Sequence, residues 1–409
     1  MIERTILSQI AYSVENRPIT LITGPRQVGK STLANLFTEK GFSYVSLASS
    51  REARSAQADP GMFLSIHKWP LIIDEVQKAK PLFEEIEAIV DEQRLKDGRG
   101  YGMYILTGSQ LYRLMEGISE SMAGRVGIIH MPTLSRNETI GVKDVKFSFD
   151  PVKIAEKADK TPMDPAKLFE LIHRGFYPEL WANKALKAQS FYSDYVETYI
   201  ERDVSDIAQV EDKYLFRSFM ELMASLSGQQ LNYETISKSL GIDARTVKKW
   251  LSILLSSDLV YLLEPYSENS ITKRIVKRPK LYFSDTGLAC YLAKVSSGQM
   301  LEASFLKGAF LETYVIGELR KTYLNNGLKP PFYYYRDSNG NEVDLLVIED
   351  GKMHLIECKS GMNYDHKAIK SFSKLAESKL AKGSQLLICN TDSVYPLGEG
   401  AYAVPLSGI

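Results

Sequence analysis

Short apolar runs alternate with amphipathic segments along the first third of the chain. The apolar runs are ITLIT, YVSL, PLIID, YILTG and VGIIHM, which begin at Ile19, Tyr44, Pro70, Tyr104 and Val126. The segments between them, such as KSTLANLFTEKG and PLFEEIEAIVDEQR, have the apolar spacing of helices. Strands that are apolar throughout are typical of a parallel sheet covered by helices on both faces. The pattern therefore predicts an α/β domain over residues 1–142.

The pattern changes three times after this domain. A stretch rich in Lys, Asp and Pro begins at Lys143 and is followed by helices, which predicts a helical connector or lid over residues 143–212. Short helices and a strand pair are predicted over residues 213–295. A helix near Gly308 and several apolar strands then predict a separate α/β domain over residues 296–409.

The composition excludes several classes of protein. The chain has 50 Lys and Arg against 50 Asp and Glu, and this zero net charge argues against binding nucleic acid or anionic membranes by bulk charge. Cys290, Cys358 and Cys389 lack any C-x-x-C spacing, which excludes a disulfide framework and a cysteine zinc site and fits a reducing compartment. No apolar run approaches the roughly 20 residues of a membrane span. We therefore expect a cytoplasmic, multidomain protein without a membrane partner.

The first apolar strand runs directly into a phosphate-binding motif. Residues 24–31 match G-x-x-x-x-G-K-S/T between a strand and a helix, the context that confirms the motif. Its glycines permit a tight turn that aims successive N–H groups at phosphate oxygens, and the following helix adds the positive end of its dipole. Lys30 would face the β- and γ-phosphates, and the Ser31 hydroxyl suits Mg²⁺. The predicted nucleotide-binding residues are Gly24, Pro25, Arg26, Gln27, Val28, Gly29, Lys30, Ser31 and Thr32.

A pair of carboxylates ends the apolar strand that begins at Pro70. Asp74 can reach the water shell of the metal, and Glu75 can polarise an attacking water. An acidic pair at a helix N-cap is the alternative interpretation. Its position after a phosphate loop favours the catalytic interpretation.

Two further segments carry candidate residues for ATP hydrolysis. The strand YILTG is followed by polar residues, and in many ATPases such a strand lies between the first two strands and senses the γ-phosphate; an ordinary glycine turn is the alternative. The candidate sensors are Thr107 and Ser109, with Gln110 beside them. Arg125, just before the strand VGIIHM, is a candidate for stabilising transition-state charge within its own subunit or across a subunit contact. Its alternative is a surface salt bridge.

Four of these segments together resemble a known family. GPRQVGKSTL, LIIDEVQKA, YILTGSQ and AGRVG, in this order, look like the AAA+-type ATPase module of a large prokaryotic family with a C-terminal domain of unknown function. RGFYPELW, LSGQQLNYETISKSLGI, RPKLYFSDTGLACYL and YYYRDSNGNEVDLLV resemble that C-terminal region, so the resemblance covers nearly the whole chain. It implies that Glu75 is the catalytic carboxylate and that Mg·ATP is bound by Gly24, Lys30, Ser31 and Asp74. The family's acidic residue near Leu47 is missing, since this chain has Ala48-Ser49-Ser50 there.

Residues 231–266 have the pattern of a winged helix. Two amphipathic helices flank a turn at Gly241, and a strand pair follows. The second helix carries Arg245, Lys248 and Lys249, which would suit the backbone and major groove of DNA. A lid packed on the ATPase, or a module that binds a protein partner, is the alternative. The wing region adds further basic residues, namely Lys273, Arg274, Lys277, Arg278 and Lys280.

The last section contains the pattern of a metal-dependent nuclease. Asp344 begins one apolar strand, and Glu357 and Lys359 share a face of the next, which a hairpin turn at Glu349-Asp350-Gly351 brings alongside. Two carboxylates could hold a divalent metal, with Lys359 activating a water. The pattern resembles the PD-(D/E)XK nuclease superfamily, and Glu312 matches its helical glutamate. A nuclease fold used only for binding, or a strand with alternating polar residues, is the alternative.

The predicted fold class is α/β: a P-loop NTPase parallel sheet, a helical and winged-helix segment, and an α/β PD-(D/E)XK nuclease-like domain. The predicted function is a Mg²⁺-dependent AAA+-like ATPase switch that couples its nucleotide state to this C-terminal region. One alternative is an ATP-regulated, metal-dependent nuclease. Another is a nucleotide-gated scaffold for DNA or a protein partner without turnover. The sequence leaves open the oligomeric state and the physiological target.

Overall fold

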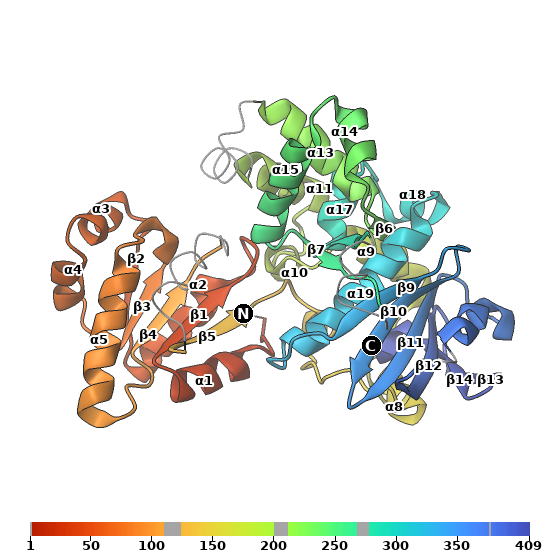
Figure 1. The fold of residues 1–409 in the computed structure, drawn as a ribbon, viewed down its shortest axis with the longest axis horizontal. Helices are drawn as coiled ribbons and strands as arrows, with labels where there is room; N and C mark the ends of the chain where they lie inside the picture. Colours follow the sequence, from red (N-terminus) through yellow and green to blue (C-terminus); the bar gives the residue numbers. More distant parts are fainter. Residues whose placement is uncertain (1, 110–123, 200–211, 268–277, 376–377) are drawn as a thin grey trace. The chain divides into compact units, whose positions relative to one another are not determined.

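The computed structural model describes residues 2–109, 124–199, 212–267, 278–375 and 378–409. The chain divides into two compact units (Figure 1). Unit 1 contains Met1–Leu134 with the short segments Ser256–Asp258 and Leu324–Leu328, and unit 2 contains Ser135–Leu255, Leu259–Tyr323 and Lys329–Ile409. In the described parts of the chain, no helix combines the length and apolar character needed to cross a bilayer.

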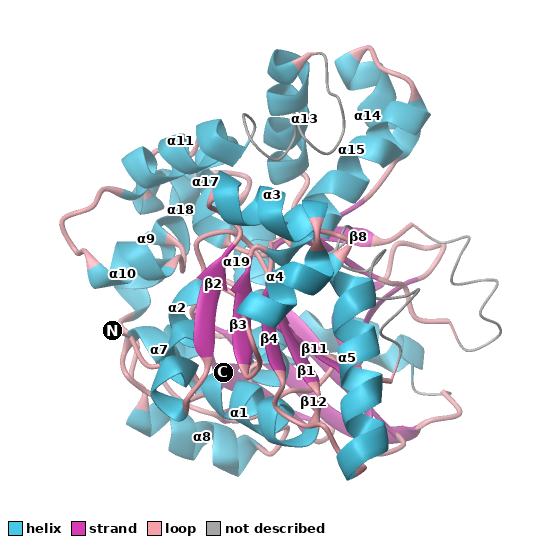
Figure 2. Cartoon of the chain, turned by 90° about the vertical axis from the view of Figure 1, so that its left-hand side faces the viewer, coloured by secondary structure: helices cyan, strands magenta, loops and turns pink. Residues whose placement is uncertain are grey.

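Unit 1 is built on a five-stranded parallel sheet with the order β2-β3-β4-β1-β5 (Figure 2). Its strands are β1 (Ile19–Thr23), β2 (Ser43–Ser46), β3 (Leu71–Asp74), β4 (Tyr104–Thr107) and β5 (Val126–His130). The strands β1, β3 and β4 are buried at every position, as expected for strands covered on both faces. The predicted parallel sheet is therefore confirmed. β4 lies directly between β3 and β1, and therefore between the first two strands of the chain in the order of the sheet.

Helices cover both faces of this sheet. On one face lie α3 (Ser50–Ala58), α4 (Pro60–Ile66) and α5 (Leu82–Asp97), which share a core with the strands and lie in front of them in Figure 2. The other helical segments are α1 (Leu7–Asn16), which contacts β1 and β5, α2 (Lys30–Asn35), which contacts β3 and β4, and the 3₁₀ turns η1 (Leu36–Lys40) and η2 (Val76–Lys78). Because all five strands run in parallel, the segments that follow β1, β3 and β4 meet at one edge of the sheet.

Unit 2 begins with a group of helices. The helices are α7 (Arg136–Thr139), α8 (Pro151–Lys160), α9 (Leu168–Arg174), α10 (Pro178–Ala182) and α11 (Ala188–Tyr199), with the turn η3 (Pro165–Lys167). Asp285 accepts hydrogen bonds from Phe176 N and the Tyr192 hydroxyl, both at 2.7 Å, so it joins segments more than 90 residues apart in sequence. Three tyrosines of α11, namely Tyr192, Tyr195 and Tyr199, are buried in the core.

The next segment of unit 2 has the element order helix, strand, helix, helix, strand, strand. The elements are α13 (Lys213–Ser225), β6 (Gln229–Gln230), α14 (Tyr233–Leu240), α15 (Ala244–Ser256), β7 (Val260–Leu263) and β8 (Lys280–Phe283). The strands form an antiparallel sheet in the order β6-β8-β7. Gly241 ends α14 in the left-handed conformation with φ +68°, which glycine adopts without the strain of a side chain.

A six-stranded mixed sheet completes unit 2 in the order β13-β14-β12-β11-β10-β9. The helical elements here are α17 (Thr286–Leu292), α18 (Gly298–Ala303), α19 (Lys307–Leu324), η5 (His366–Leu375) and η6 (Leu406–Gly408). The strands are β9 (Phe332–Arg336), β10 (Glu342–Glu349), β11 (Lys352–Lys359), β12 (Ala381–Cys389), β13 (Tyr395–Gly398) and β14 (Ala401–Pro405). Asp350 and Gly351 connect β10 and β11 with positive φ angles, as a two-residue hairpin turn requires, so the predicted hairpin is present.

Candidate functional site

The segment between β1 and α2 forms a tight loop that only glycine permits at two positions. Gly24 has φ +142°, and a Cβ placed on it would lie 2.2 Å from the carbonyl oxygen of Met131. Gly29 has φ +96°, in the left-handed region, directly before the first residue of α2. The two motif glycines therefore fix the course of the backbone from residue 24 to residue 31.

The ammonium group of Lys30 lies within this loop. Its Nζ donates hydrogen bonds to the carbonyl oxygens of Gly24 at 2.9 Å and Pro25 at 2.6 Å, and the residue is 8% exposed. Burial lowers the pKa of Lys30 to about 8, and the negative charge of Glu75 partly offsets this effect. A cation held at this place, with its charge poorly solvated, favours the arrival of an anion.

Asp74 is the centre of the second half of the site. It ends β3 and lies buried, where its Oδ1 accepts a hydrogen bond from Ser31 Oγ at 2.6 Å and its Oδ2 accepts one from Ser46 Oγ at 3.0 Å. The Thr107 hydroxyl also donates to Oδ1. The structure thus brings together the predicted residues Ser31, Asp74 and Thr107 from three different elements. Ser46 was missed, although it faces Asp74 in the register of β2 with β3.

Glu75 and Ser109 complete this edge of the sheet. Glu75 adopts a left-handed backbone with φ +58°, its N–H donates to Thr107 Oγ1 at 3.4 Å, and its carboxylate accepts a hydrogen bond from Gln77. The Ser109 hydroxyl is buried and has no hydrogen-bond partner in the described parts of the chain. Gln110 lies outside the described residues. Glu75 is therefore placed beside Asp74 with its carboxylate held by a neighbouring amide.

The structure places Arg125 away from the phosphate loop. Its carbonyl pairs with the N–H of Ile19 at the start of β1, whereas the loop follows the end of β1, roughly 13 Å farther along the strand. Its guanidinium contacts two carboxylates of α5, Asp91 at 2.6 Å and Glu87 at 2.8 Å. The Asp91 hydrogen bond and charge raise the pKa of Arg125, as expected for an ion pair. This geometry favours the salt-bridge interpretation of Arg125, and its role in hydrolysis stays a prediction.

Family models match three parts of the chain. Residues 16–140 match an AAA domain, residues 165–299 match the domain of unknown function DUF8612, and residues 307–409 match the domain of unknown function DUF4143. The N-terminal unit carries an AAA domain. The phosphate loop, Asp74 and Glu75 all lie within the residues that match the AAA domain. The sequence resemblance is confirmed for the AAA domain and for the C-terminal domain of unknown function.

Two curated proteins resemble the chain over almost its entire length. An uncharacterized protein of Mycobacterium tuberculosis is 26% identical over 404 residues, which is 99% of this chain and 81% of the relative. An uncharacterized protein of Mycobacterium bovis matches with the same values. Both alignments run through the AAA domain and the DUF4143 region together.

Solved structures of P-loop proteins show a weaker likeness. The Walker-type ATPase of Pyrococcus abyssi is 14% identical, with 71% of this chain and 96% of that chain covered and a TM-score of 0.42. A RuvB variant of Thermotoga maritima is 16% identical, with 63% and 88% covered and a TM-score of 0.28. Both scores lie below 0.5, so the likeness over the whole chain is weak.

The nuclease-like residues of the DUF4143 region also come together. The Lys359 ammonium contacts Glu357 Oε1 at 2.6 Å, so these two residues share a face of β11 as predicted from their spacing. Asp344 on β10 accepts a hydrogen bond from Cys358 N at 2.9 Å. Burial raises the pKa of Glu357 to about 8 and that of Glu312 to about 7, and the negative charge of Asp344 adds to both shifts.

Two residues of this cluster were missed by the sequence analysis, and one was misplaced. Lys280 was counted among the basic residues of a DNA-facing wing, but it is 2% exposed and contacts Glu312 at 2.8 Å and also Glu342. Glu342 and Tyr282, whose hydroxyl donates to Glu312, had not been assigned a role. The sequence gives only a weak indication of their role, which is that these polar residues stand among apolar ones on β10 and β8. A polar or charged side chain within a buried strand needs a partner. Three other wing residues, Lys273, Arg274 and Lys277, lie outside the described residues.

The three basic residues predicted to face DNA lie on the surface. Arg245, Lys248 and Lys249 are exposed along α15, and their spacing of three and four residues places them on one side of the helix. The Lys248 ammonium also lies 5.5 Å from the centre of the Tyr233 ring on α14. The helix thus presents a local basic face despite the zero net charge of the chain.

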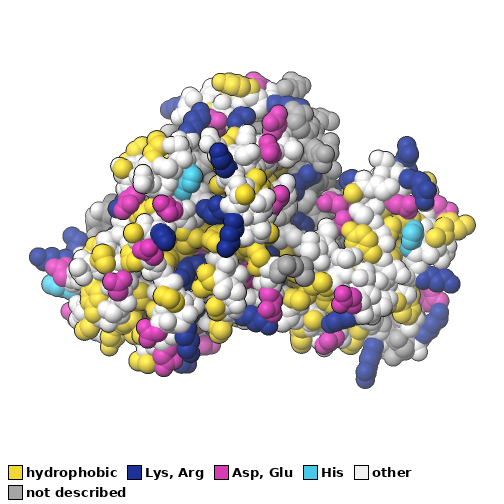
Figure 3. Space-filling view, turned by 180° about the vertical axis from the view of Figure 1, so that it is seen from behind, with side chains coloured by type: hydrophobic (Ala, Val, Ile, Leu, Met, Phe, Trp, Pro, Cys, Tyr) yellow, Lys and Arg dark blue, Asp and Glu magenta, His cyan; other side chains and the backbone are white. Residues whose placement is uncertain are grey.

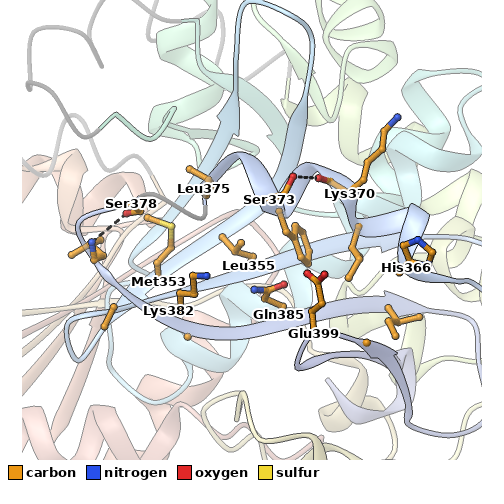
Figure 4. A pocket seen from close by; sticks show the side chains of 17 residues that line it. Met353, Leu355, His366, Lys370, Ser373, Leu375, Ser378, Lys382, Gln385 and Glu399 are labelled. Atoms are coloured by element: carbon orange, nitrogen blue, oxygen red, sulfur yellow. Dashed lines mark hydrogen bonds between the residues drawn. The ribbon is translucent and has the colours of Figure 1, made fainter.

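A separate pocket lies on the six-stranded sheet. It has a volume of about 470 Å³ and is lined by β11, β12, η5 and the turn after β13. Figure 4 shows Met353 and Leu355 on its floor, with Gln385 and Glu399 close beside them. None of the residues proposed from the sequence is among its lining residues.

Proposed function

We propose that this chain is a Mg²⁺-dependent ATPase that works as a nucleotide switch. The observation that carries this proposal is the contact between the two halves of the site, in which Ser31 Oγ donates to Asp74 Oδ1 at 2.6 Å. In P-loop ATPases, a hydroxyl and a carboxylate in these two positions hold the metal that accompanies the triphosphate. The AAA-domain match over residues 16–140 supports the same conclusion.

The residues around Asp74 fit a magnesium ion. Asp74 is buried among the hydroxyls of Ser31, Ser46 and Thr107, and hard oxygen ligands of this kind are those that Mg²⁺ prefers. Ser31 and Asp74 would hold the ion, which would neutralise charge on the β- and γ-phosphate oxygens.

Each protein group then has one task in hydrolysis. The loop from Gly24 to Ser31 orients the triphosphate through its backbone N–H groups, and Lys30 binds the β- and γ-phosphates. Glu75 orients and polarises the attacking water. Thr107, which bonds both the Asp74 carboxylate and the Glu75 N–H, holds these two residues in one geometry. Arg125 is proposed to act on ATP across a subunit contact.

Two substitutions test the reaction centre. Lys30→Ala removes the phosphate-facing charge, so we expect ATP binding to be lost in calorimetry. Glu75→Gln keeps the shape but removes the base, so we expect binding to persist while turnover falls about 10²- to 10⁴-fold. Glu92→Gln, the same change at an exposed position of α5, is the matched control and should hydrolyse ATP at the wild-type rate.

The outcomes also distinguish the ATPase switch from a nucleotide-gated scaffold without turnover. Equal turnover by the wild type and Glu75→Gln would overturn the assignment of Glu75. Tight ATP binding by a wild-type protein that shows no turnover would favour the nucleotide-gated scaffold instead.

The basic face of α15 supports a second function, contact with duplex DNA. The order of α13, β6, α14, α15, β7 and β8 is that of a winged helix, whose second helix of the helix-turn-helix pair enters the major groove. Arg245, Lys248 and Lys249 are exposed on this helix. In the view of Figure 3, basic and acidic side chains are mixed over the surface, so binding would have to come from such a local face. A protein partner on the same face is the alternative outcome.

A further inference from the structure

The carboxylate cluster of the DUF4143 region is closed by a lysine from another sheet. Lys280 belongs to β8 of the three-stranded sheet, whereas its partners lie on α19 and β10. Figure 1 shows β6 and β7, the neighbours of β8, beside α19 and β9. The side chain of Lys280 is 3% exposed, so the ammonium is removed from water and depends on the carboxylates for its partners.

Lys280 uses carboxylate oxygens that a divalent metal would need. Its Nζ lies 2.8 Å from Glu312 Oε1 and also contacts Glu342 Oε1. Glu312 Oε1 accepts the Tyr282 hydroxyl as well, so this oxygen has two donors. The helical glutamate predicted as part of a nuclease centre is therefore bonded to an ammonium and a phenol.

The other two carboxylates each have one oxygen occupied by a hydrogen-bond donor. Asp344 Oδ2 accepts from Cys358 N at 2.9 Å, and Glu357 Oε1 accepts from the Lys359 ammonium at 2.6 Å. Glu357 Oε2 is buried without a hydrogen-bond partner in the described parts of the chain. Within the described ranges, no three His, Cys, Asp or Glu side chains form a group that could hold a metal ion.

We propose that the Lys280 ammonium is the resident counter-charge of this cluster and takes the place of a divalent cation. A positive charge among the carboxylates repels an incoming cation, and a metal could enter only if Lys280 left its two glutamates unpaired and buried. The DUF4143 region as folded therefore binds no metal at Asp344 and Glu357 and does not perform metal-dependent cleavage. Lys280 instead joins β8 to α19 and β10. This inference is independent of the proposed ATPase, because it concerns residues of unit 2 alone.

The test is Mn²⁺ binding to the nucleotide-free full chain, followed through the paramagnetic resonance signal of free Mn²⁺. Wild type and Asp344→Asn should give superimposable titrations, since the cluster takes up no metal in either. Lys280→Met removes the ammonium and leaves the carboxylates, so this variant should gain one Mn²⁺ per chain. The gain should disappear in Lys280→Met/Asp344→Asn, and Lys280→Arg, which keeps the charge, should behave as wild type.

Two results overturn the proposal. The first is Mn²⁺ binding by the wild type that Asp344→Asn removes. The second is a Lys280→Met chain that keeps the wild-type circular dichroism spectrum and a cooperative unfolding transition but gains no Mn²⁺. If Lys280→Met does not fold, wild type, Asp344→Asn and Lys280→Arg still test the proposal. Mn²⁺ binding that depends on Asp344 while a cation occupies position 280 contradicts the proposal.

Discussion

The buried ammonium of Lys30 makes ATP binding depend on pH in a direction that can be calculated. Burial lowers the pKa of Lys30 to about 8 before nucleotide binds. In the complex, the negative charge of the triphosphate favours the ammonium and raises this pKa again. A chain whose Lys30 is neutral must therefore take up a proton when it binds ATP. Because fewer chains carry that proton at higher pH, the affinity for ATP falls as the pH rises above 8.

The size of this effect follows from the fraction of protonated lysine. With a pKa of about 8, roughly nine chains in ten carry the ammonium at pH 7, but only about one in eleven does so at pH 9. The apparent Kd for ATP should therefore rise about tenfold between pH 7 and pH 9, which is about 1.4 kcal/mol. The phosphates do not contribute a change of this sign, because their last proton leaves near pH 6.

Calorimetry measures both the affinity for ATP and the number of protons taken up on binding. Kd is determined at pH 7, 8 and 9 in two buffers with different enthalpies of ionisation, so that proton uptake appears as a difference between the observed heats. Lys30→Arg keeps a permanent charge, so its affinity should not change with pH, whatever its absolute value. A wild-type Kd that stays constant from pH 7 to pH 9, with no proton uptake at pH 9, would refute the reasoning.

Three other predictions follow from contacts described above. Gly24→Ala should lose ATP binding, because the added Cβ would meet the Met131 carbonyl oxygen. Gly41→Ala is the control: Gly41 also has a positive φ but has open space around it, so this variant should bind ATP normally. Equal ATP binding by both variants would contradict a role for the close approach of Gly24 to Met131. Lys280→Met should lower the free energy of unfolding in urea by about 3–5 kcal/mol, because it leaves buried carboxylates unpaired, and adding Glu312→Gln should restore part of the loss. Arg245→Ala and Lys248→Ala should each weaken duplex binding and reduce its salt slope by about one in fluorescence anisotropy. Wild-type chains that bind no DNA at low salt would point to a protein partner.

The parts of the molecule that depend on local sequence were predictable. The phosphate loop is a contiguous stretch whose glycines dictate its backbone, and the apolar strands around it identify the sheet, so Lys30 and Asp74 could be placed on one edge. Ser31 and Thr107 meet at Asp74 because parallel strands present their ends together. These inferences needed only the period of the pattern and the direction of the strands.

Two predicted residues have contacts far away in sequence that the local pattern does not indicate. Arg125 precedes a strand in a way that fits a catalytic arginine, but the strand register places it at the other edge of the sheet, beside the carboxylates of α5. Lys280 lies in a basic stretch, so a count of charges assigns it to the surface, while its partners follow 32 and 62 residues later. Composition cannot distinguish a solvated lysine from one that is buried against acids supplied by another element.

The link between Lys280 and Glu312 bears on how this chain could be divided or recombined. A cut near residue 296, where the sequence suggests a domain border, would leave the acids on one fragment and their ammonium on the other. It would also separate Tyr334 from residues 264–266, with which it exchanges backbone hydrogen bonds. Gene fusions that exchange only the last hundred residues for those of a relative should therefore lose stability, and the region from β7 to the last strand should be exchanged as one piece.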